Sequence, residues 1–142
     1  MTDTDYMRMA LELAERGMGW TSPNPMVGAV IVKDGRVIGQ GWHARCGELH
    51  AERSALKNCG EDPAGATMYV TLEPCAMCAG AALLARVDAI VFGAFDPVAG
   101  CCGSVLDLTD GVLQRTVRCI GGVQEAACAR LLQAYFQNRR MG

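Results

Sequence analysis

The chain has 142 residues and a formal net charge of −2 at pH 7, with 51% hydrophobic and 20% charged residues. This length suits one domain with one core, and this balance excludes a disordered or low-complexity polymer. The apolar runs are far shorter than a bilayer span, and the acidic start does not match a secretory signal. We therefore expect a cytoplasmic protein that does not associate with a membrane.

Hydrophobic periodicity and turn residues predict alternating helices and strands. A helix is expected over residues 6–14, and a loop with two prolines follows at 21–25. Asp34-Gly35 predicts a hairpin between strands at 26–33 and 36–42. The later predicted elements are a helix over 50–58, a strand over 66–72, a helix over 75–85, a strand over 87–92, a Gly-rich loop over 96–104 leading into a short helix, a strand over 116–120 and a helix over 128–140.

This order predicts a single domain over residues 1–142 of the α/β class. We expect one mixed sheet of about five strands with helices on both faces, which makes three layers, α/β/α. Charge is uneven along the chain: residues 1–110 hold 8 Lys and Arg against 14 Asp and Glu, whereas residues 111–142 hold five Arg against Glu125. The basic C-terminal part either contacts phosphates or forms an ordinary solvated helix face.

Eight cysteines are a high number for this length. Because the chain lacks a secretion signal, we expect them to be reduced. Cys59, Cys119 and Cys128 lie in apolar surroundings and are interpreted as small core residues. Cys101 and Cys102 lie in the Gly-rich loop, where they either replace small residues or are exposed thiols prone to oxidation.

A candidate metal site is formed by His50, Cys75 and Cys78. The two cysteines, three residues apart, share one helix face, and His50 lies at the start of the preceding predicted helix. Three protein ligands leave one tetrahedral position open, as in catalytic zinc sites. Both helix N-termini favour thiolates at this place. We therefore expect one Zn²⁺ per subunit.

Glu52 follows His50 by two residues and is the expected catalytic residue, a proton carrier between the attacking water and the substrate. His-x-Glu followed by Pro-Cys-x-x-Cys is the known signature of zinc deaminases. Three alternatives are a redox Cys-x-x-Cys pair, a structural zinc site with His43 as a fourth ligand, and a zinc-dependent binding module without enzymatic activity.

These residues resemble the cytidine-deaminase-like superfamily over nearly the whole chain. The second half is most similar to bacterial tRNA adenosine deaminases, through YVTLEPCAMCAGA at 69–81 and VFGA at 91–94. That resemblance implies a homodimer that converts the wobble adenosine of a tRNA anticodon loop to inosine. It also implies that Ala94, Phe95 and Asp96 contact nucleotides around the target base. Ala51 is a further candidate substrate-binding residue.

The first half is instead similar to the pyrimidine deaminase of riboflavin biosynthesis, through TSPNPMVG at 21–28 and GELHAE at 47–52. Asn24 and His43 would then hydrogen-bond the sugar or ring edge of a substrate. In that family a longer insert separates the two zinc cysteines, unlike the spacing of Cys75 and Cys78. The expected function is therefore tRNA adenosine deamination, and the alternative is deamination of a small-molecule pyrimidine, purine base or nucleoside.

Overall fold

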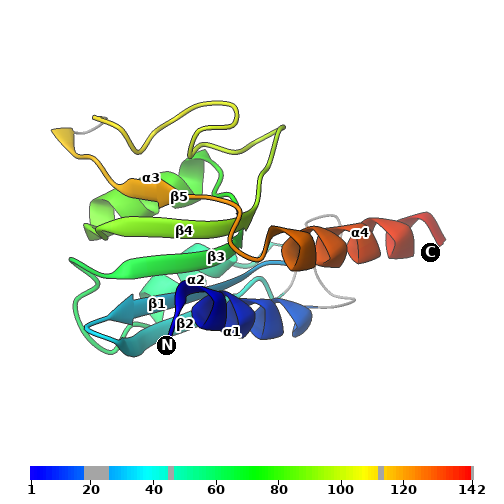
Figure 1. The fold of residues 1–142 in the computed structure, drawn as a ribbon, viewed down its shortest axis with the longest axis horizontal. Helices are drawn as coiled ribbons and strands as arrows, with labels where there is room; N and C mark the ends of the chain where they lie inside the picture. The colour runs from blue at the N-terminus through cyan, green and yellow to red at the C-terminus, as the bar shows by residue number, and fades with distance from the viewer. Residues whose placement is uncertain (18–25, 45–46, 112–113, 142) are drawn as a thin grey trace.

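The computed structural model describes residues 1–17, 26–44, 47–111 and 114–141, with the backbone alone for 135–141. Helices and strands alternate along the chain (Figure 1). In chain order they are α1 (Asp3–Glu15), β1 (Gly28–Lys33), β2 (Arg36–Trp42), α2 (Ala51–Lys57), β3 (Thr67–Leu72), α3 (Ala76–Ala85), β4 (Ala89–Ala94), β5 (Arg118–Ile120) and α4 (Glu125–Met141).

The strands form one five-stranded sheet in the order β2-β1-β3-β4-β5. β1 pairs antiparallel with β2 and β3, whereas β4 pairs parallel with β3 and β5. Asp34 and Gly35 connect β1 to β2 with positive φ angles of 53° and 73°, as a tight two-residue hairpin requires. The predicted mixed sheet and hairpin are thus confirmed.

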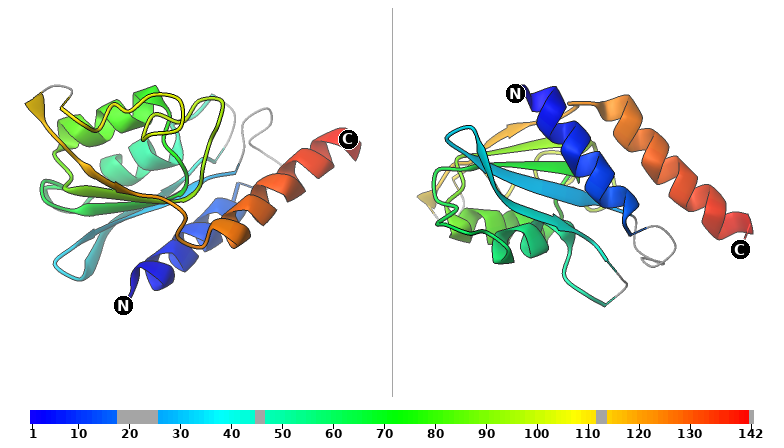
Figure 2. Two further views of the ribbon diagram at one scale, coloured as in Figure 1. Left: turned by 45° about the horizontal axis from the view of Figure 1, so that its top comes forward. Right: turned by 90° about the horizontal axis from the view of Figure 1, so that it is seen from below.

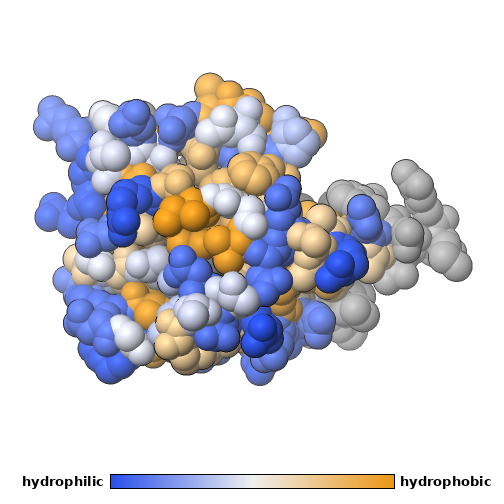
Figure 3. All heavy atoms as spheres, in the orientation of Figure 1, coloured by the Kyte–Doolittle hydropathy of each residue, from blue (hydrophilic) through white to orange (hydrophobic). Residues whose placement is uncertain are grey.

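Helices cover both faces of the sheet and complete the predicted three layers (Figure 2). Met68 and Val70 of β3 pack on the α2–α3 side, whereas Tyr69 between them packs on the α1–α4 side. This alternation follows from the two-residue period of a strand. At the edge of the α1–α4 side, Ile120 of β5 is 42% exposed, and apolar surface gathers between β5 and α1 (Figure 3).

Helix α2 packs very closely on β2 because two glycines face it. A Cβ atom at Gly39 would lie 2.5 Å from the carbonyl oxygen of Ala55, and one at Gly41 would lie 2.4 Å from the backbone nitrogen of the same residue. Neither position has room for a side chain. This close contact fixes the distance from the sheet to α2 and to the residues at the N-terminus of α2.

Residues 96–111 show no helix, although a short one was expected after the Gly-rich loop, and residues 112–113 of the expected stretch lie outside the described residues. Residues 96–111 form turns and an isolated bridge between Cys102 and Asp107. The backbone amides of Asp96, Cys102 and Ser104 donate to the carboxylate of Glu73, which holds this segment in its non-helical path. Within the described part of the chain, no helix is long and apolar enough to cross a membrane.

Candidate metal centre and active site

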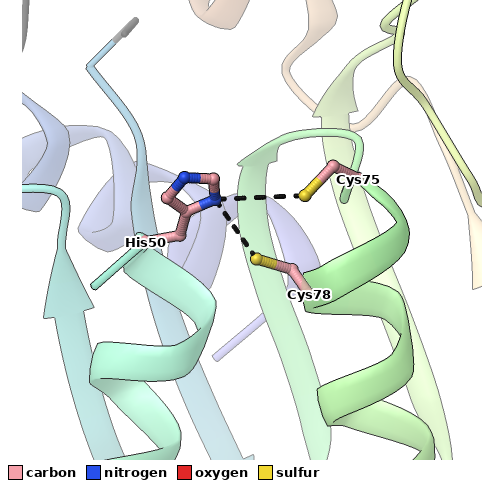
Figure 4. A group of neighbouring side chains, drawn as sticks. All are labelled: His50, Cys75 and Cys78. Carbon is pink, nitrogen blue, oxygen red and sulfur yellow. Dashed lines mark hydrogen bonds between the residues drawn. The ribbon is translucent and has the colours of Figure 1, made fainter. Parts of the chain in front are cut away.

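The three predicted metal ligands lie together at the N-termini of two neighbouring helices (Figure 4). His50 is the N-cap of α2 and Cys75 is the N-cap of α3, while Cys78 is the third residue of α3. The Nδ1 atom of His50 lies 3.5 Å from the Sγ atom of Cys78 and 3.9 Å from that of Cys75. The sequence therefore predicted this cluster correctly.

The geometry of the cluster fits a zinc ion. Its ligand atoms all lie within 4.8 Å of one another. Tetrahedral zinc with bonds of about 2.0 Å to nitrogen and 2.3 Å to sulfur separates its ligands by roughly 3.5 Å. The Nδ1–Sγ distances of 3.5 and 3.9 Å are close to that value. These three side chains can therefore hold the ion with one position left for substrate or water.

The two sulfurs also favour a bound cation. A hydrogen bond from Cys78, with the backbone amides of Cys78 and Met77, lowers the pKa of Cys75 to about 5. The same hydrogen bond to Cys75, together with burial, raises the pKa of the Cys78 thiol. Two adjacent thiolates repel each other, so the second sulfur requires a cation in order to ionise. The chemistry of this pair is therefore that of a metal site.

Glu52 lies in the first turn of α2 and is only 4% exposed. Burial raises the pKa of Glu52 to about 7, and the nearby Cys75 sulfur acts in the same direction. A carboxyl group with a pKa near neutrality both accepts and donates protons readily. Glu52 also lines the same cavity as His50 and Cys75. Its position is thus suited to proton transfer beside the metal ligands.

The cavity has a volume of about 170 Å³. A heteroaromatic ring of a substrate can enter a cavity of this size. Its wall combines apolar side chains with the acidic groups of Glu52, Glu73 and Asp96. The described lining residues are Val27, His43, His50, Glu52, Leu72, Glu73, Cys75, Asp96 and Ala99.

His43 forms a buried part of this wall, with 2% exposure. Its Nδ1 atom lies 3.1 Å from the carbonyl oxygen of Leu49, and its ring meets the His50 ring edge-on at 5.4 Å. A carbonyl oxygen only accepts hydrogen bonds, so Nδ1 carries the proton. In the neutral ring the Nε2 atom is therefore a hydrogen-bond acceptor.

The other predicted substrate residues differ in position. Asp96 lines the cavity, whereas Phe95 beside it is 49% exposed and packs edge-on against Phe92. Ala51 and Ala94 are buried and are not among the described lining residues. Asn24 lies outside the described residues. The contacts that any of them makes with substrate remain predictions.

Four lining residues, Val27, Leu72, Glu73 and Ala99, were not identified from the sequence. The signal for Glu73 was its position directly before Pro74-Cys75, next to a metal ligand. The other three are small or apolar residues near strand ends or in the loop. Nothing in their residue types distinguishes them from core residues.

The described cysteines are all free thiols. Cys101 and Cys102 are 5% and 7% exposed, so the interpretation as exposed thiols is wrong, and the interpretation as replacements of small residues stays a prediction. Cys128 is buried in the α1–α4 side of the core, and Cys59 and Cys119 pack against the α2–α3 side. Outside the metal cluster, these cysteines therefore act as core residues.

Residues 1–94 match a protein family described as the cytidine and deoxycytidylate deaminase zinc-binding region. The chain is 41% identical over 148 residues to the chloroplastic riboflavin biosynthesis protein PYRD of Zea mays, covering 100% of this chain and 37% of that protein. It is 43% identical over 103 residues to a diaminohydroxyphosphoribosylamino-pyrimidine deaminase of Buchnera aphidicola, covering 68% of this chain and 70% of that protein. The chain thus spans about a third of the maize protein.

Two solved structures have the same fold. RibD of Acinetobacter baumannii superposes with a TM-score of 0.83 at 39% identity, covering 95% of this chain and 39% of that one. A structure from work on tRNA:A34 deaminases, which perform A-to-I editing at the wobble position, has a TM-score of 0.74 at 33% identity and covers 91% of this chain and 99% of that one. With His50, Cys75 and Cys78 brought together as a zinc site, the chain belongs to the cytidine and deoxycytidylate deaminase zinc-binding family.

Proposed function

We propose that this chain hydrolytically deaminates a small pyrimidine nucleotide of the diaminohydroxyphosphoribosylaminopyrimidine type. The observation that carries the proposal is the likeness to a deaminase of that name, 43% identical over 103 residues that make up 68% of this chain. The sequence favoured adenosine in tRNA as the substrate, with a small-molecule pyrimidine as the alternative. The curated relatives support the alternative better.

In the proposed reaction His50, Cys75 and Cys78 hold a zinc ion, which supplies Lewis acidity for the activation of water. Glu52 takes a proton from the attacking water and delivers it to the ring nitrogen beside the amino-bearing carbon. The water oxygen bonds to that carbon, Glu52 carries the proton of the new hydroxyl group to the amino group, and the C–N bond breaks to release ammonia and leave a carbonyl group on the ring. The near-neutral pKa of Glu52 suits both directions of transfer.

The size and polarity of the cavity support a single ring as the reacting part. The ring would enter the cavity of about 170 Å³, and the ribose and phosphate would extend through its open side. Val27 and Leu72 offer apolar contact to the ring faces.

The test is a deamination assay on the purified, zinc-loaded chain with a panel of four substrates: diaminohydroxyphosphoribosylaminopyrimidine, cytidine, dCMP and a tRNA with adenosine at the wobble position. We expect ammonia release with the first substrate at least tenfold faster than with the others. Inosine formation in the tRNA without turnover of the pyrimidine would overturn the proposal.

Adenosine in tRNA remains the second candidate, because two observations favour it. Two residues separate Cys75 from Cys78, as in the resemblance to tRNA adenosine deaminases. The tRNA:A34 deaminase structure is also covered by this chain over nearly its full length. Phe95, half exposed next to Asp96, would then be available to stack on a neighbouring base. The same panel separates the two candidates.

We also infer that two copies of the chain associate, as the resemblance implies. Met77 and Leu84 on the outer side of α3 are 49% and 76% exposed. Sedimentation of the zinc-loaded chain should give twice the mass of one chain. The mass of a single chain at micromolar concentration would contradict this part of the proposal.

A further inference from the structure

Glu73 is a buried carboxylate with an unusual number of hydrogen-bond donors around it. It is 2% exposed and lies between the end of β3 and the metal ligand Cys75. Oε1 accepts from the backbone N–H of Asp96 at 3.1 Å and from the hydroxyl of Ser104. Oε2 accepts from the N–H groups of Cys102 at 3.1 Å and Ser104 at 3.0 Å.

All four donors belong to the segment that follows β4. The carboxylate therefore holds both ends of residues 96–104, which we call the 96–104 loop. Two backbone hydrogen bonds also connect this part of the chain to Glu73 and its neighbour. The N–H group of Glu73 donates to the carbonyl oxygen of Ala94, and the N–H group of Cys101 donates to the carbonyl oxygen of Pro74. Charge-assisted hydrogen bonds to buried carboxylates are about twice as strong as neutral ones.

The fit between loop and carboxylate is tight at Gly100. A Cβ atom there would lie 2.5 Å from the Cδ atom of Glu73 and 2.5 Å from the carbonyl oxygen of Asp96. The loop thus closes directly around the acid, and only glycine allows this approach. Two residues of the same loop, Asp96 and Ala99, line the cavity. The position of one cavity wall therefore depends on Glu73.

We propose that Glu73 is a positioning residue that holds the 96–104 loop against the cavity and so sets the affinity for substrate. The substrate part of this inference rests on the proposed function, whereas the loop part does not. Glutamine cannot replace the carboxylate, because its terminal NH₂ group is a hydrogen-bond donor. In one orientation that group would face the N–H groups of Cys102 and Ser104. In the other it would face the N–H group of Asp96 and the hydroxyl of Ser104.

The test compares Glu73→Gln with the unmodified chain by amide hydrogen exchange, zinc content and steady-state kinetics on the four-substrate panel. We expect exchange at Asp96, Cys102 and Ser104 to accelerate about tenfold or more, since each lost bond to a charged group is worth about 1.5–3 kcal/mol. One zinc per chain should remain. KM should rise about tenfold, with kcat within about threefold, because the loop shapes the binding site rather than the reacting atoms.

Two further variants keep the test decisive. Ser104→Ala removes one donor and leaves the amide bonds, so it should raise KM about twofold to threefold without affecting folding. Glu61→Gln changes an exposed glutamate that pairs with Arg36, and it should leave all three measurements unchanged. General structural damage would instead lower zinc content and kcat together, with KM unchanged.

Three results would overturn the inference. Unchanged amide exchange in Glu73→Gln would show that the carboxylate does not hold the loop. Loss of zinc in proportion to loss of activity would assign Glu73 to the metal site. A fall in kcat at constant KM would contradict a role in binding. If no substrate in the panel is turned over, the proposed function fails together with the substrate part, and the exchange rates alone decide the loop part.

Discussion

Glu52 is buried and lines the cavity. Its burial makes folding less favourable, whereas its position suits it to proton transfer. Burial of an ionisable carboxyl costs free energy of folding, and it raises the pKa of this group to about 7. The group is nevertheless placed in the cavity, beside His50 and Cys75. A residue that is unfavourable for folding and yet lines the cavity is a candidate for catalysis.

Glu52→Gln should therefore abolish deamination without weakening the fold. We expect kcat to fall about 10²–10⁴-fold, because the amide cannot carry protons. The melting temperature should stay equal or rise, since glutamine has a similar shape and no charge to desolvate. Ammonia release and thermal unfolding measure the two effects, and metal analysis should still find one zinc per chain. Retained turnover in this variant would exclude Glu52 as the proton carrier.

Metal removal should make Cys75 the most reactive described thiol. It is half-buried at the cavity, and hydrogen bonds from Cys78 and the helix N-terminus lower its pKa to about 5. Bound zinc would block the sulfur, whereas a chelator would expose a thiolate. Iodoacetamide labelling at pH 7 followed by peptide mass spectrometry should show Cys75 modified only after chelation. Cys128, whose pKa burial raises to about 11, serves as the unreactive control.

Equal labelling of Cys75 with and without chelator would show that zinc is not bound there.

The ligand residues could be predicted from sequence because their types and spacing are local signals: Cys75 and Cys78 share one helix turn. The residues that form the cavity wall could not be predicted from the sequence. Leu72 reaches it through the parallel register of β3 and β4, in which Leu72 pairs with Ala94, and no short-range pattern encodes that register.

At the scale of elements, the contact between α2 and β2 depends on the absence of side chains. Gly41→Ala would place a Cβ atom 2.4 Å from the backbone nitrogen of Ala55 and 2.7 Å from the carbonyl oxygen of Ala51. The helix must then move away from the sheet, together with His50 and Glu52. We expect a loss of about 1–3 kcal/mol in stability and weaker zinc binding.

Thermal unfolding and zinc titration check this prediction for Gly41→Ala. Gly60→Ala is the matched control: a Cβ atom at Gly60 would have no heavy atom within 4 Å, and the residue has no positive φ angle, so this variant should be neutral. If both variants behave alike, close packing of α2 on β2 does not position the metal ligand.

The elements themselves were largely predictable, because period and turn residues are local. The helix predicted over 50–58 is observed at Ala51–Lys57, and the strand predicted over 87–92 is observed two residues later, at Ala89–Ala94. No helix is seen over residues 96–111, although a short one was expected after residue 104. Glu73, distant in sequence, accepts hydrogen bonds from the amides of Cys102 and Ser104 and so fixes the path of the chain there, which no local pattern encodes.

At the scale of the whole molecule, one sheet joins two clusters of core residues. The α2–α3 side carries both helices that supply metal ligands, whereas the α1–α4 side carries none of them (Figure 2). Zinc would therefore link the N-termini of two helices that also pack directly against each other. Because β1, β3 and β4 contribute residues to both sides, loosening of one side should propagate to the other.

Removal of zinc should thus lower the stability of the whole chain in a single transition. A metal present at about 1,000 times its Kd stabilises the folded state by about 4 kcal/mol, which corresponds to a fall in Tm on the order of 10 °C on chelation. Circular dichroism of the zinc-loaded and chelated chain measures this difference. His50→Ala, which lacks one ligand, should melt near the chelated chain and respond little to chelator. A chelator-induced shift of the same size in His50→Ala would mean that the stabilising metal binds elsewhere.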